Sequence, residues 1–162
     1  TNLPVHGFVQ IVLDGAGNDS FLLDNLAVRE RTARLGLSAD LRRLRAGQRT
    51  QLGFRLAGDA AVAQHTYALL GSMSGTSPGI PIGSANLPLV PDAFFGLVAG
   101  LLGTPATPGF LGQLGPDGCA FASFDTMIPV PASMIGVNLD FAWLTLQPGI
   151  ATSEPTRVTI TP

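Results

Sequence analysis

The sequence predicts an all-β protein: an antiparallel β-sandwich of the immunoglobulin-like or jelly-roll-like kind, with about seven or eight strands and little helix. Three observations lead to this prediction. Short segments with alternating apolar residues recur along the chain, turn-forming residues separate them, and few segments could form a helix. The length of 162 residues is enough for one core.

The first 28 residues are expected to form an N-terminal β-hairpin or a strand arm. Residues 7–13 and 20–28 are rich in apolar residues and predict two strands. The segment between them, residues 14–19 (DGAGND), consists of turn formers. The rest of the chain, residues 29–162, is expected to form the β-sandwich.

Residues 29–49 carry most of the positive charge and allow two structures. Ser38 could cap a helix, which Gly36 and Gly47 would confine to about two turns. A strand at residues 34–38 followed by a loop fits the sequence equally well.

Later segments supply the remaining elements. Residues 92–102 predict a short helix capped by Asp92, although two glycines weaken it. Residues 115–118 (GPDG) predict a turn. Strands are expected at residues 50–58, 65–73, 119–127, 138–149 and 156–162.

Charge is scarce and unevenly placed. Charged residues make up 12% of the chain, about half of the roughly 25% that is usual in globular domains. Eight of the nine arginines lie within residues 29–55. The pI near 5.5 argues against a nucleic-acid partner, so an acidic surface on a neighbouring subunit is the expected partner of these arginines. No membrane span is expected, because Pro105 and Pro108 interrupt the uncharged stretch 93–116.

A serine motif at residues 75–79, GTSPG, matches the G-x-S-x-G pattern of hydrolases. In those enzymes the residue after the serine donates its backbone N–H to the oxyanion, and a helix follows. Pro78 has no N–H to donate. We therefore expect a turn here, no catalytic residue, no cofactor and no enzymatic activity.

A second motif, residues 14–21 (DGAGNDSF), resembles one calcium-binding nonapeptide repeat. Asp14, Asn18 and Asp19 are its candidate ligands, but a single copy lacks half of the ligands that stacked repeats supply. A hairpin turn is the favoured interpretation, and no metal is expected. Asn18 also begins an N-glycosylation sequon, Asn18-Asp19-Ser20.

Cys119 is the only cysteine, so an intrachain disulfide is excluded. Its apolar neighbours predict a small buried side chain. His65 and the other histidine, His6, have no metal-ligand partner at the usual spacing, and Trp143 lies in the middle of an apolar strand pattern typical of a core.

Two sequence patterns resemble known families. Residues 67–79 (YALLGSMSGTSPG) and 87–92 (LPLVPD) resemble a C-terminal β-domain of large secreted bacterial proteins, and the resemblance covers residues 35–162. It implies secretion and no particular activity. Residues 20–28 (SFLLDNLAV) are similar to the last strand of carbohydrate-binding-type jelly rolls.

These observations predict a non-catalytic, extracellular or cell-surface structural protein that assembles with itself into a fibre or surface layer. The N-terminal strands would pair with a sheet edge of a neighbour. The run of small residues at 67–92 would either lie against another subunit or form a loop over its own core. The alternative function is a secreted carbohydrate-binding or adhesion module. The residues expected to mediate assembly are Phe8, Val9, Ile11, Val12, Phe21, Leu22 and Leu23.

Overall fold

A computed structural model describes residues 35–162, which belong to the second of two compact units, Arg31–Pro162. The predicted all-β class is confirmed. The strands are β1 (Gly36–Ala39), β2 (Arg43–Arg45), β3 (Gln51–Ala57), β4 (Thr66–Ser72), β5 (Ile80–Ile82), β6 (Ala85–Leu87), β7 (Leu111–Gln113), β8 (Cys119–Asp125), β9 (Asn138–Gln147) and β10 (Thr156–Thr161). The helices are α1 (Ala93–Gly100) and two 3₁₀ turns, η1 (Ala60–Val62) and η2 (Ala132–Met134).

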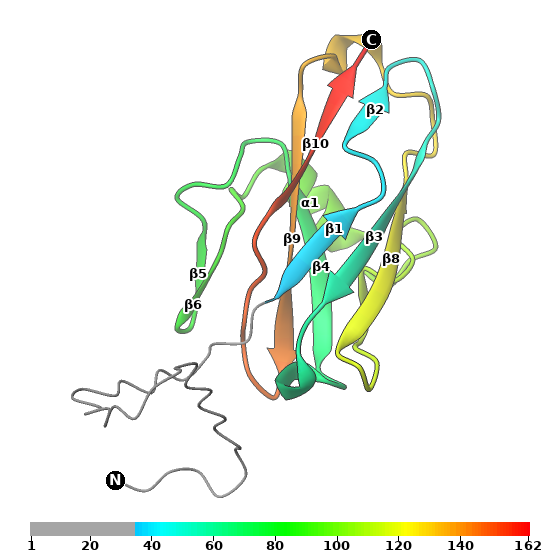
Figure 1. Cartoon of the computed structure of the whole chain (residues 1–162). Coiled ribbons are helices and arrows are strands. Elements are labelled where there is room, and N and C mark those ends of the chain that lie inside the picture. Colours follow the sequence, from blue (N-terminus) through cyan, green and yellow to red (C-terminus); the bar gives the residue numbers. More distant parts are fainter. Residues whose placement is uncertain (1–34) are drawn as a thin grey trace, which may run out of the picture. The chain divides into compact units, whose positions relative to one another are not determined.

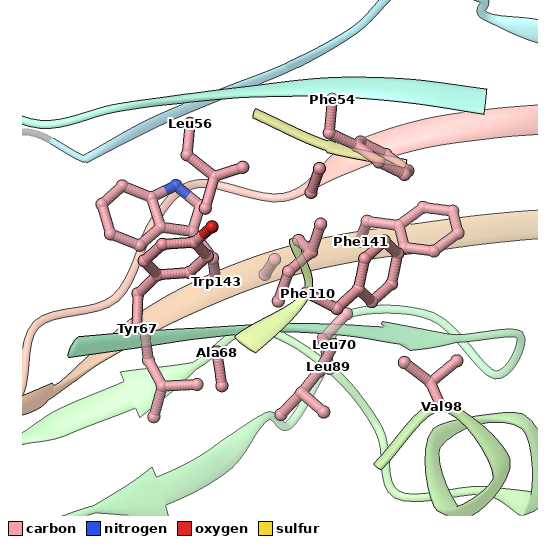
Figure 2. Packing of buried hydrophobic residues seen from close by; sticks show 14 of the residues in the cluster. Phe54, Leu56, Tyr67, Ala68, Leu70, Leu89, Val98, Phe110, Phe141 and Trp143 are labelled. Carbon is pink, nitrogen blue, oxygen red and sulfur yellow. The ribbon is translucent and has the colours of Figure 1, made fainter. Parts of the chain in front are cut away.

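The strands form two main sheets and one separate hairpin (Figure 1). One sheet has the order β1-β3-β8, the other has the order β2-β10-β9-β4-β7, and β5 pairs with β6. Side chains of the two sheets meet in a shared core (Figure 2). The rings of Phe54 on β3 and Phe141 on β9 lie 4.7 Å apart. Trp143 is fully buried, as predicted, and its indole N–H donates to the carbonyl of Gly36 at 2.9 Å.

One pairing differs from the antiparallel expectation, because β2 runs parallel to β10. The chain first forms β1, which pairs with β3 at the edge of the three-stranded sheet. It then crosses to the five-stranded sheet and forms the edge strand β2. Of the two structures that the sequence allowed here, the strand is correct and the two-turn helix is wrong. Leu37 and Ala39 of β1, two residues apart, both pack against the core, and a spacing of two places side chains on one face of a strand but not of a helix.

The chain enters and leaves this domain at opposite ends. Gly36 at the start of β1 lies beside Ala57, the last residue of β3. Thr161 at the end of β10 lies beside Arg45, the last residue of β2. We call the second end, where β2 lies near the C-terminus (Figure 1), the arginine end, because Arg42, Arg43, Arg45 and Arg49 are exposed there.

The small-residue run after β4 folds back over its own domain. Strands β4 and β9 are buried on both faces, from Tyr67 to Ser72 and from Leu139 to Thr145. Leu87 and Leu89 are fully buried and join the same core cluster. Leu87 and Leu89 therefore cover the domain's own core, as one of the two expectations for this run had it, and contact of the run with another subunit stays a prediction. The serine motif lies in the loop before β5, and a strand rather than a helix follows it.

Four three-residue strands, β2, β5, β6 and β7, were not expected from the sequence. Three residues are too few to show an alternating pattern. The buried β9 also carries an unexpected acid, Asp140, which is 1% exposed. It accepts two hydrogen bonds from the guanidinium of Arg157 on β10, at 2.7 and 3.0 Å, and these bonds raise the pKa of Arg157. The ion pair compensates for the burial of the carboxylate.

Replacement of Leu89 tests whether the 73–92 segment is part of the core. Leu89→Ala should reduce the free energy of unfolding by about 3 kcal/mol, because it leaves a cavity in a close-packed site. Leu97→Ala, at a side chain that is 55% exposed, is the matched control and should change it by less than about 0.5 kcal/mol. Urea unfolding of both variants provides the measurement. Equal effects would show that the segment does not contribute to the core.

Candidate functional site

An apolar hollow opens at the arginine end of the domain. Its volume is about 390 Å³. Strands from both sheets, α1 and the proline-containing segment after β8 contribute to its wall. Twelve of its thirteen lining residues are apolar, and none is charged: Leu44, Met73, Ala93, Phe94, Leu97, Phe124, Thr126, Ile128, Val130, Pro131, Met134, Leu139 and Ile160.

The hollow lies between residues of both sheets, such as Phe124 on β8 and Leu139 on β9, and Phe94 and Leu97 of α1. Phe94 on α1 packs edge-on against Phe124 and Phe141, with ring centroids 6.0 and 6.1 Å apart. The next turn of α1 leaves Leu97 55% exposed, and across the hollow Ile128 is 65% exposed. The rim is therefore as apolar as the floor.

Asp92 fixes α1 in this position. One carboxylate oxygen caps the helix by accepting from Phe95 N at 2.7 Å. The other accepts from Met73 N, Ser74 N and Ser72 Oγ, at 2.7, 2.8 and 3.0 Å, all at the end of β4. Partial burial raises the pKa of Asp92, but these hydrogen bonds outweigh it and lower the pKa to about 2. The carboxylate thus ties the helix that lines the hollow to the end of β4.

The lining of the hollow suits binding rather than catalysis. Its one polar side chain, Thr126, already accepts a hydrogen bond from Thr50 N at 3.0 Å. Neither an acid nor a base reaches the cavity from the residues that line it. Such a surface can take up an apolar group of a partner, with the hydrophobic effect as the driving force.

A second, shallow groove lies on the outer face of the three-stranded sheet, with a volume of about 450 Å³. Phe121 on β8 is 74% exposed and lies directly opposite Arg55 on β3. Asp40 borders the groove and accepts from Gly53 N at 2.9 Å. A Cβ at position 53 would come within 2.8 Å of the Asp40 carboxylate, so a larger residue there would displace this side chain. Alternation along β8 could have revealed Phe121, because Ala120 and Ala122 face the other way.

The predicted assembly residues and the calcium and glycosylation candidates, Asp14, Asn18 and Asp19, lie outside the described residues. Cys119 is partly exposed, so the prediction of a buried side chain is wrong; it occupies an outward position at the start of β8. Within residues 35–162, no three histidine, cysteine or acidic side chains gather as a metal site would need. None of the helices in this range has the length and hydropathy that crossing a bilayer requires.

The role of Asp92 can be measured through its charge. Above about pH 5 the carboxylate contributes fully to stability, and this contribution falls as the pH drops from about 4 through the folded pKa of about 2. Asp92→Asn should cost about 1 kcal/mol and Asp92→Ala about 2 kcal/mol at pH 7. The difference between wild type and Asp92→Asn should narrow towards pH 2, because asparagine does not titrate.

Denaturant unfolding at pH 7, 4 and 2 provides this measurement. Asp59→Asn is the control, since the exposed Asp59 caps only the three-residue turn η1. A difference between wild type and Asp92→Asn that stays constant with pH would show that the charge of Asp92 is not what stabilises the helix.

No protein-family model matches the chain, and no curated protein is significantly similar to it. The resemblance to a domain of secreted bacterial proteins stays a prediction from the sequence.

Proposed function

We propose that this chain is a non-catalytic, extracellular structural protein whose copies assemble into a fibre or surface layer. One observation carries the proposal: a solvent-open apolar hollow whose rim and floor hold no charged side chain. Contiguous exposed apolar surface on a small domain usually marks a site that another molecule covers.

The scarcity of charge supports the same proposal. Charged residues make up 12% of the chain, so few like charges keep neighbouring copies apart. Pairing between the N-terminal strands and a sheet edge of a neighbour remains part of the proposal, and secretion is proposed from the sequence resemblance. Leu87 and Leu89 of the run at 67–92 are buried within the domain, so these two side chains would not take part in a contact between copies.

A carbohydrate-binding or adhesion module is the second candidate, and the groove beside Phe121 favours it. An exposed ring next to Arg55 and Asp40 combines a stacking surface with charged hydrogen-bonding groups. Tyr67 and Trp143 are 2% and 0% exposed and cannot stack on a sugar. A single phenylalanine on a flat sheet offers less binding surface than the hollow, so we rank this function second.

A charge placed in the hollow tests the first proposal. Ile128→Asp should abolish association of the full-length chain, because docking would bury an unpaired carboxylate. Phe121→Asp makes a similar change at an equally exposed apolar side chain away from the hollow and should leave association unchanged. Light scattering and electron microscopy of both variants and the wild type provide the measurement. Monomeric wild type at high protein concentration would contradict self-assembly.

Soluble polysaccharides in native gels test the second candidate. If the groove binds a glycan, migration of the wild type is retarded by at least one polysaccharide, and Phe121→Ala abolishes the retardation. Ile128→Asp should then still be retarded, which separates the two surfaces. Equal migration of wild type and Phe121→Ala on every polysaccharide would remove this function.

A further inference from the structure

We propose that the hollow receives the apolar segment Phe21–Leu23 of a neighbouring copy of this chain. The inference deepens the proposed function and rests on it, since it names the donor and the acceptor of the assembly contact. Three properties support it: the chemistry of the segment, the charge around the hollow, and the place where the chain enters the domain.

The segment has an apolar middle that suits the hollow, and an acidic residue lies on each side of this middle. Phe21, Leu22 and Leu23 are three large apolar residues in succession, and Asp19 and Asp24 flank them. An uncharged cavity can take the apolar residues, and the two acids would then lie at its rim. Beside an acidic surface, the two aspartates that flank this segment would be repelled.

The arginine end supplies the complementary charge. Leu44 lines the hollow, and its neighbours on the edge strand β2, Arg43 and Arg45, are exposed. The acids nearby are largely occupied. Asp125 binds Arg49 at 2.6 Å, and Asp92 accepts four hydrogen bonds within the domain.

Asp140 is paired with Arg157, and Asp40, which follows β1, accepts from Gly53 N. Positive charge therefore predominates beside β2. Opposite charges around an apolar contact favour one partner and one orientation.

The path of the chain favours a neighbour's hollow. Leu35 precedes β1 and lies at the end opposite the arginine end, because Gly36 pairs with Ala57. Thirteen residue steps join Leu22 to Leu35, a span of at most about 45 Å. To reach its own hollow, the segment would have to run back along the domain, whose longest strand, β9, spans about 33 Å, so the linker would have to extend to about three quarters of its full length. A copy stacked end to end presents its arginine end directly to the point of exit.

This contact joins different surfaces of the two copies, so it does not close a dimer. Repetition of a donor-to-acceptor contact gives an open row of subunits unless the rotation closes a ring. The edge strand β2 borders the hollow, so strand pairing and insertion of apolar side chains can occur at one place. Charged side chains on an exposed edge strand disfavour pairing with strands of other proteins. The aspartates that flank Phe21–Leu23 would instead be attracted by the arginines on β2.

Complementation between two defective variants tests the inference on full-length protein. Phe21→Asn/Leu23→Asn removes the donor and keeps the hollow, while Ile128→Asp removes the acceptor and keeps the donor. Each variant alone should be monomeric. An equimolar mixture should give heterodimers and no longer species, because each pair holds one intact contact. Mass measurement by light scattering distinguishes these outcomes.

Wild-type-like polymers from Phe21→Asn/Leu23→Asn would overturn the inference and leave the proposed function intact. A mixture that stays monomeric would also overturn it. A monomeric wild type would overturn both the inference and the proposed function.

A charge exchange gives an independent readout. Asp19→Arg/Asp24→Arg should weaken association about tenfold or more, and Arg43→Glu/Arg45→Glu in the same chain should restore it. Arg55→Glu, which alters an exposed arginine on the outer sheet face, is the control and should have no effect. If Arg43→Glu/Arg45→Glu did not restore association of the Asp19→Arg/Asp24→Arg variant, these charges would not be in contact in the assembly.

Discussion

The burial of β4 and β9 on both faces is the constraint on which the rest of the domain depends. The inner faces of these strands meet the three-stranded sheet, as the contact between Phe54 and Phe141 shows. Their outer faces carry Ala68, Leu70 and Leu144, which also need cover from water. The segment between β4 and α1 provides buried leucines for this purpose. A strand pair of this kind behaves more like the centre of a parallel sheet than the face of an ordinary antiparallel one.

Two carboxylates form hydrogen bonds with polar groups in and beside these buried strands. Asp140 lies inside the sheet and is neutralised by the guanidinium across the ladder. Asp92 lies where β4 ends and satisfies backbone groups of two elements that are far apart in the sequence. It therefore links the covering segment, the helix and the strand, and it holds in place the helix whose Phe94 and Leu97 line the hollow.

The sequence was sufficient to predict the parts that depend on local pattern. The strands around Leu52, Leu69 and Trp143, the helix cap and the all-β class were all predicted from alternation, turn residues and capping. The hollow was not, because its wall combines residues from seven separate segments, such as Leu44 and Ile160, which only the paired β2 and β10 bring together. Likewise, the buried state of Leu89 depends on which strand lies beneath it, and composition does not encode this.

The opposite placement of the chain's entry and exit has a mechanical consequence. β10 is held between β9 and the parallel strand β2, and the chain enters at the far end through β1. Tension applied between residue 35 and the C-terminal proline would load these ladders along the strand axis. Hydrogen bonds loaded in this way must break together, whereas bonds pulled apart from one end open one after another. The domain is therefore arranged to resist stretching along its strands.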